Sequence, residues 1–281
     1  MAVSPERLAQ LYREACELEL QAFKPGNVSV YADGHDMTVA DFRISAEVSA
    51  TPLCHPGYCL GEKIYYAVKA TREAVACNTN LGIILLAAPL LQAALNGSGL
   101  TLRESLRQVL SATTVTDADW VFRAIALASP GGLGETQEQD VHAVATVTLK
   151  AAMGLASDKD RIALQYLTDY EDIFDFAILS YYNAMNIWKS KSWSAVAVYT
   201  ALLSQFPDSH IERKYGNQYS GMIMQTMAKL SRALATPMPE QVMPLLYQVD
   251  QELKAKRINP GTTADMTVAT LLAVLLQEEW T

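Results

Sequence analysis

The sequence lacks the features that would place the protein in a membrane, in a secretion pathway or on nucleic acid. Its first twenty residues carry charges throughout and have no apolar core of the kind a signal peptide needs. The longest apolar run, Leu81–Leu91, is too short to span a bilayer and is typical of a buried helix. Positive charge is also scarce, with 22 Lys and Arg against 30 Asp and Glu and a net charge of −8. We therefore expect a cytoplasmic protein that binds neither membrane nor nucleic acid, although local cations could still hold a small anion.

Familiar metal and nucleotide motifs are missing as well. The four cysteines form no secreted-type framework, and Cys54, His55 and Cys59 match no standard zinc spacing and are followed by no second Cys/His pair. The turn 130–134 (Pro-Gly-Gly-Leu-Gly) lacks the Lys-Ser/Thr ending of a P-loop, and no strand precedes it. These absences exclude the usual zinc, Walker and dinucleotide sites.

Apolar residues recur at helical spacing along almost the whole chain, and no segment shows the period of a strand. We predict an all-α fold, a multi-helical bundle that forms a single domain over residues 1–281, because no linker, repeat or low-complexity stretch divides the chain. The expected helices cover residues 4–22, 38 onward, 61–75, 81–95, 101–112, 117–127, 140–153, 158–166, 170–203, 221–234, 239–254 and 266–280.

Several of these helices are entered through short turns rich in Gly, Asn or Thr. Such turns present free N–H groups at a helix start, where the helix dipole also favours an anion. The segments are Asn78-Thr79-Asn80, Gly131 to Gly134, and Asn259 to Asp265. Each has a plainer interpretation, since Thr262 and Asp265 also fit a capping box and the glycines also fit a helix C-cap. Taken singly, these turns do not establish a ligand site.

Two further segments concentrate polar and cationic groups. Arg213 offers a planar fork for phosphate oxygens and Lys214 a compact charge, but an Arg-Lys pair after Pro207 is also typical of a solvated surface loop. Asp158, Arg161 and Gln165 would share one face of a helix, where they could bind a ligand or form a surface ion pair. Both interpretations stay open at this point.

In chain order, these segments resemble one family. The matching segments are Lys24-Pro25-Gly26-Asn27-Val28, Gly34-His35-Asp36-Met37, Thr71-Arg72, Asn78-Thr79-Asn80-Leu81-Gly82, Pro130-Gly131-Gly132-Leu133-Gly134, Asp140-Val141, Asp160-Arg161-Ile162-Ala163, Gln165-Tyr166, His210, Arg213-Lys214, Gly216 and Asn259-Pro260-Gly261-Thr262-Thr263-Ala264-Asp265. Together they resemble the ATP:dephospho-CoA triphosphoribosyltransferase family and span nearly the whole chain.

The resemblance implies a helical enzyme that joins ATP to 3′-dephospho-CoA. A ribose hydroxyl of dephospho-CoA attacks C1 of the ATP ribose, adenine leaves, the triphosphate is retained, and the new linkage is α. The product is the precursor of the prosthetic group on acyl carrier subunits of citrate lyase and malonate decarboxylase.

This chemistry suggests roles for the matching residues. A carboxylate would stabilise the oxocarbenium-like state, and the departing adenine must gain a proton. The triphosphate requires Mg²⁺ held by oxygen ligands, together with cationic side chains and free amides at helix starts. We expect Asp36, Asp140 and Asp265 in metal or oxocarbenium roles and His35 or His210 in proton transfer. The expected ATP- and substrate-binding residues are Lys24, Arg161, Arg213 and Lys214 on phosphates, with Asn27, Asn78, Thr79, Asn80, Gly82, Gly131, Gly132, Gly134, Gln165, Asn259, Thr262 and Thr263 orienting the substrates.

The sequence departs from the citrate-lyase type at the first matching segment, Lys24-Pro25-Gly26-Asn27-Val28, and in the loop that follows it; this region is here called the first signature. That type usually carries Val-Asp and a longer Gly-Ala-His-x-Asp-Met stretch, whereas here Ser29 follows Val28 and the loop to Asp36 is shorter. This resembles a divergent branch found in archaea and methylotrophic bacteria. A second hypothesis is therefore α-ribosyl transfer to another acceptor, in synthesis of a methanopterin-type cofactor. A third is a non-catalytic nucleotide-binding module. The oligomeric state is left open, with a homo-oligomer as one option.

Overall fold

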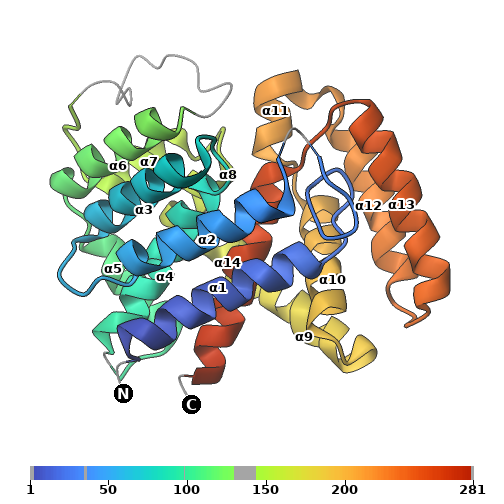
Figure 1. The fold of residues 1–281 in the computed structure, drawn as a ribbon, viewed down its shortest axis with the longest axis horizontal. Coiled ribbons are helices and arrows are strands. Elements are labelled where there is room, and N and C mark those ends of the chain that lie inside the picture. Colours follow the sequence, from blue (N-terminus) through green and yellow to red (C-terminus); the bar gives the residue numbers. More distant parts are fainter. Residues whose placement is uncertain (1–2, 35–36, 98, 130–143, 280–281) are drawn as a thin grey trace. The chain divides into compact units, whose positions relative to one another are not determined.

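The structure, a computed structural model, describes residues 3–34, 37–97, 99–129 and 144–279, and Figure 1 traces their helices. In these ranges the only β-type contacts are two isolated bridges, Ser29–Ala32 and Gly34–Met37, and no strand forms. The all-α prediction is confirmed. None of the helices in the same ranges is both long and apolar enough to cross a membrane.

Contacts between residues divide the chain into two compact units. The first unit comprises Met1–Cys16, Ala40–Glu171 and Leu272–Thr281, and the second comprises Glu17–Val39 and Asp172–Leu271. Two helices divide between the units, α1 (Pro5–Gln21) and α14 (Gly261–Glu279), and a third, α2 (Val39–Leu53), has only its first residue, Val39, in the second unit. The prediction of a single domain over residues 1–281 stays a prediction.

Most of the first unit is built from seven helices. They are α2 (Val39–Leu53), α3 (Leu60–Val75), α4 (Leu81–Asn96), α5 (Leu102–Ser111), α6 (Val115–Ala128), α7 (Leu149–Ala156) and α8 (Arg161–Thr168). The apolar α4 is buried along most of its length and packs against α3 and α5. Helices α3 and α6 are in close contact at Gly61, where a Cβ would lie 2.7 Å from the Cα and carbonyl oxygen of Asp117. Only glycine fits there, and its N–H donates to the Asp117 carboxylate at 2.9 Å.

The second unit packs its helices around α10. Its elements are the π-helical turn η1 (Asp172–Ala177), α9 (Ile178–Trp188), α10 (Lys191–Gln205), α11 (Ser209–Tyr215), the 3-10 turn η2 (Gly216–Gln218), α12 (Ser220–Ala233) and α13 (Pro239–Ala255). Helix α10 packs against α9 and α12, and α12 packs against α13.

The prediction of one helix over residues 170–203 is wrong. The chain first forms the π-helical turn η1, and α9 then ends at Lys189, which adopts the left-handed region with φ +51°. Ser190 caps the next helix by accepting from the N–H of Trp193 at 3.4 Å. The indoles of Trp188 and Trp193 stack across the break with centroids 4.2 Å apart. A local cap and this aromatic pair therefore outweigh the continuous apolar pattern.

Four other local predictions also need correction. The helix predicted over 140–153 starts only at Leu149, where Thr148 is its cap; residues 144–148 are not helical, and 140–143 lie outside the described ranges. Helix α8 starts at Arg161 rather than Asp158, because Asp160 accepts from two first-turn N–H groups. The segment interpreted as a surface loop around Arg213 is α11, capped in the same way by Asp208. The helix predicted over 266–280 already starts at Gly261 as α14, so Thr262 lies inside the helix and not before it.

Candidate active site

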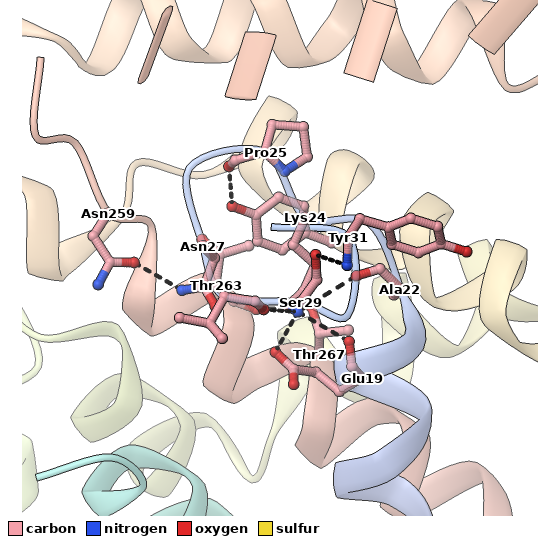
Figure 2. A network of polar contacts seen from close by, with 12 residues as sticks. Glu19, Ala22, Lys24, Pro25, Asn27, Ser29, Tyr31, Asn259, Thr263 and Thr267 are labelled. Atoms are coloured by element: carbon pink, nitrogen blue, oxygen red, sulfur yellow. Dashed lines mark hydrogen bonds and ion pairs between the residues drawn. The ribbon is translucent and has the colours of Figure 1, made fainter. Parts of the chain in front are cut away.

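A buried lysine organises residues 22–34 of the second unit, here called the N-terminal loop. Lys24 has no exposed surface, and its Nζ donates to the carbonyl oxygens of Glu19 at 2.9 Å and Val28 at 2.6 Å (Figure 2). It also lies 3.2 Å from the Glu19 carboxylate and 3.5 Å from the carbonyl oxygen of Ala22. The ammonium therefore ties the end of α1 to the far side of the loop.

This geometry corrects the phosphate role predicted for Lys24. Burial lowers the pKa of Lys24 and raises the pKa of Glu19, and the charge of each partner opposes both shifts. The ammonium is surrounded by four oxygens of its own chain and has no solvent-facing surface that could meet a triphosphate. We assign Lys24 to the folding of the loop.

The same loop is anchored at three distant positions of the second unit. The side-chain amide of Asn27 donates to the amide oxygen of Asn259 at 2.7 Å (Figure 2). The N–H of Gly26, at φ +83°, donates to the carboxylate of Asp250 on α13 at 2.8 Å. The hydroxyl of Tyr199 on α10 donates to the carbonyl oxygen of Pro25 at 2.8 Å. The first and the last segments that match the family, at Asn27 and Asn259, lie more than 230 residues apart in the sequence and are in direct contact.

Asp208 joins the start of α11 to the start of α14. One carboxylate oxygen accepts from the N–H groups of His210 and Ile211, at 2.9 and 3.1 Å. The other accepts from the N–H and the hydroxyl of Thr263, at 2.8 and 2.7 Å. Burial raises the pKa of Asp208, while these hydrogen bonds favour its charged form. The four bonds make Asp208 a fixed junction, which the sequence did not identify.

His210 is held at this junction. Its N–H also donates to the hydroxyl oxygen of Thr262 at 3.2 Å, and its ring lies beside Gly261, where a Cβ would be 3.5 Å from Cγ. Arg213 and Lys214 lie on the exposed surface of α11. The two threonines predicted to orient substrate instead use their side chains, in these contacts, to hold His210 and Asp208.

The first unit contains a second polar cluster, made of Tyr12, Ser45, Ser49, Thr79 and Asn80. The hydroxyls of Ser45 and Thr79 lie 2.6 Å apart, and those of Tyr12 and Ser49 lie 3.0 Å apart. The amide of Asn80 donates to Ser49 at 3.4 Å. All five side chains are buried. This first-unit polar cluster fixes the turn between α3 and α4.

Other predicted residues of the first unit lie around its helix starts. Asn78 caps α4 by accepting from the N–H of Leu81 at 3.2 Å, and Gly82 lies in the first turn of that helix. Gln165 is fully buried on α8 and donates to the carbonyl oxygen of Arg161 at 3.3 Å. Asn78 thus has a capping role, while a substrate role for Gly82, Arg161 and Gln165 stays a prediction.

The sequence matches one protein family, described as ATP:dephospho-CoA triphosphoribosyl transferase, over residues 5–281. The chain belongs to this family. Its activity is that of a triphosphoribosyl-dephospho-CoA synthase, and the protein is therefore a transferase. A crystal structure from Archaeoglobus fulgidus, described as a candidate triphosphoribosyl-dephospho-CoA synthase, shares the fold with a TM-score of 0.64 and 23% identity. The match covers 84% of this chain and 99% of that one. No protein of curated function matches the sequence.

Several residues predicted to act in this synthase lie outside the described ranges. They are His35, Asp36, Gly131, Gly132, Gly134 and Asp140. Asp265, the remaining predicted carboxylate, is half-buried in α14. In the ranges that are described, no three His, Cys, Asp or Glu side chains are grouped closely enough to hold a metal ion. The predicted magnesium ligands therefore stay a prediction.

One face of α13 is a part of the synthase that sequence reasoning missed. Tyr247, Asp250 and Lys254 follow at spacings of three and four and face the N-terminal loop. Tyr247 packs edge-on against Phe23, with centroids 4.6 Å apart, and Lys254 pairs with Asp250 at 3.0 Å. The Cε of Lys254 lies 3.1 Å from the position of a Cβ at Gly34. The helical spacing of these residues is their only sequence signal, because an amphipathic pattern does not identify the segment that a helix packs against.

A buried amine on α3 is a second residue that sequence reasoning missed. Lys63 has no exposed surface, and its Nζ forms no hydrogen bond. Burial lowers the pKa of Lys63 from 10.5 to about 8, although the nearby thiols of Cys54 and Cys59 favour the charged form. A buried ammonium without a hydrogen-bond partner destabilises the fold.

We expect Lys63→Met to increase the free energy of unfolding at pH 7 by about 1–3 kcal/mol, the usual cost of a buried polar group without a partner. Because the folded pKa is lowered, the unfolded chain binds more protons between pH 8 and 10.5. The stability of the unchanged protein should therefore rise toward that of the variant as pH increases through 8. Urea denaturation at pH 7, 8 and 9 measures both effects. A variant that is less stable at pH 7, or a gap that does not depend on pH, would contradict this account of Lys63.

Proposed function

We propose that this chain transfers the 5-triphosphoribosyl group of ATP to 3′-dephospho-CoA and releases adenine. A hydroxyl oxygen of the acceptor ribose bonds to C1 of the ATP ribose, while the bond from C1 to the adenine nitrogen breaks. The acceptor hydroxyl loses a proton and the departing adenine gains one. The triphosphate stays on the transferred ribose, and magnesium enters as the ion that accompanies ATP. We place the reaction in the cytoplasm.

The observation that carries this proposal is that segments around Asn27, His210 and Asn259, all of which match the family, contact one another in the second unit. Asn27 bonds to Asn259, and His210 bonds to Thr262. These segments are separated by 183 residues from 27 to 210 and by 49 from 210 to 259, so the contacts require the tertiary fold. Of the two histidines predicted for proton transfer, His210 lies in the described ranges, and we assign it this role in the reaction because an imidazole can exchange a proton near neutral pH.

The roles of the remaining residues follow from their surroundings. Arg213 and Lys214 lie on the exposed face of α11, one helical turn from His210, and we assign both to phosphate oxygens. Asp208 and Thr263 are buried and fix the start of α11, and Lys24 is buried and fixes the N-terminal loop. Asp36, Asp140 and Asp265 remain our candidates for magnesium and for the developing positive charge on the ribose.

A second candidate acceptor is supported by the short first signature. Ser29 and Ala32 exchange backbone hydrogen bonds of 3.1 and 3.0 Å, which closes residues 29–32 into a tight turn. The short turn changes the loop that follows Val28, whereas the other segments that match the family, which we assign to ATP as the ribosyl donor, are retained in the sequence. Transfer of an α-linked ribosyl phosphate to an acceptor of methanopterin-type cofactor synthesis would use the same chemistry.

Free adenine is the product that tests the proposal. The full-length protein is incubated with ATP, Mg²⁺ and either dephospho-CoA or a pterin-precursor acceptor, and adenine is separated and quantified. We expect adenine with dephospho-CoA and only background with ATP alone. Adenine only with the pterin precursor would establish the second acceptor instead. ATP binding without adenine release in any mixture would contradict both reactions and leave a nucleotide-binding module.

A further inference from the structure

Two half-exposed rings of the second unit rest on one buried ring at the N-terminal loop. Phe23 is 1% exposed, whereas Tyr31 and Tyr247 are 45% and 42% exposed. Tyr31 lies parallel to Phe23, with centroids 5.3 Å apart and planes 8° apart. Tyr247 meets Phe23 edge-on at 77°. One face of Tyr31 is therefore backed by protein, and the other is open.

The backbone that carries Tyr31 is fixed. Residues 29–32 form the tight turn closed by Ser29 and Ala32, and the N–H of Val30 donates to the carbonyl oxygen of Leu20 at 3.0 Å. The N–H of Tyr31 points to the hydroxyl of Ser29 at 3.4 Å, while its ring points away from the Lys24 network (Figure 2). Tyr31 is thus held in place in the folded protein, so a flat ligand would meet a ring that is already oriented.

We propose that the open face of Tyr31 stacks against the adenine ring of a substrate. This inference rests on the proposed function, in which ATP and dephospho-CoA each carry an adenine. A rigid aromatic face beside the first signature is suited to a planar base, since rings prefer offset stacking at the spacing already seen between Tyr31 and Phe23. Tyr31 lies three residues before Gly34, which begins the segment with the predicted catalytic residues.

The test measures binding of four probes to the full chain by calorimetry. Two carry adenine, ATP and dephospho-CoA, and two are their counterparts without adenine, tripolyphosphate and 4′-phosphopantetheine. We expect Tyr31→Ala to weaken binding of one adenine-bearing probe by about 5- to 150-fold, the range of base–aromatic stacking. The affected probe identifies the substrate. Binding of tripolyphosphate and 4′-phosphopantetheine should be unchanged, and Tyr31→Phe should bind like the unchanged protein.

Tyr182→Ala is the matched control, because Tyr182 on α9 is 40% exposed and belongs to no signature segment. If Tyr31→Ala binds both adenine-bearing probes normally, or loses as much affinity for a probe without adenine, the stacking proposal is wrong while the proposed function stands. If the unchanged protein binds neither ATP nor dephospho-CoA, the proposed function fails and the stacking proposal fails with it.

Discussion

Replacing Lys24 with methionine is expected to destabilise the protein by about 3–5 kcal/mol, the cost of leaving a buried charge without its partner. Glu19, which is 4% exposed, would lose the ammonium that lies 3.2 Å from its carboxylate. The carbonyl oxygens of Glu19 and Val28 would also lose a donor. The free energy of unfolding from urea denaturation, with nucleotide absent, measures this loss.

Two further variants make the Lys24 experiment decisive. Adding Glu19→Gln to Lys24→Met removes the stranded charge, so the double variant should be more stable than Lys24→Met alone. Lys69→Met breaks an exposed pair with Glu73 and should leave stability unchanged, because solvent screens such pairs. If Lys24→Met unfolds like the unchanged protein but no longer binds ATP, Lys24 is a phosphate ligand after all and our correction is wrong.

Asp208→Ala has the second largest expected effect, a loss of about 3–5 kcal/mol. The change removes a helix cap and leaves the two Thr263 donors buried without an acceptor. Because Asp208 joins two signature segments, we also expect the rate of adenine release to fall. Thermal or urea denaturation measures the first effect and the adenine assay the second.

Asp160→Ala provides the matched comparison for Asp208. Asp160 caps α8 through the N–H groups of Ile162 and Ala163, the same geometry as the first half of the Asp208 site. Its removal should cost only about 1 kcal/mol, the usual value of a cap. Equal losses for the two variants would show that the Thr263 bonds contribute nothing, which contradicts the junction we describe.

Local pattern was enough to predict most helices of this fold. Helices α3, α5, α6, α12 and α13 lie within a few residues of their predicted bounds because each has an apolar face, and a capping box or an N-terminal proline marks the start of all but α12. The errors arose where a contact between residues overrides the pattern. The Trp188–Trp193 stack interrupts a long apolar stretch, and the Asp208 cap turns a charged segment into a helix.

The site residues chosen from the sequence stay predictions, but the structure shows the surroundings of several of them, which the sequence did not. Charge and motif position selected Lys24 as a phosphate ligand, yet only the fold shows that its ammonium is buried against Glu19 and Val28. Asp250 and Lys254 were missed for the opposite reason, since i, i+4 residues on an amphipathic helix look like an ordinary surface pair until the loop above them is placed. Long-range contacts of this kind leave no local signal in a single sequence.

The central claim is that the whole triphosphoribosyl group moves while adenine leaves, and labelled ATP tests it most directly. The protein is incubated with dephospho-CoA, Mg²⁺ and ATP that carries radioactive phosphorus in its γ-phosphate and a separate label in its adenine. We predict that the phosphorus label appears in a product with dephospho-CoA and that free labelled adenine forms in equal amount. Phosphorus label released as phosphate or pyrophosphate, or moved to dephospho-CoA without adenine release, would contradict the account.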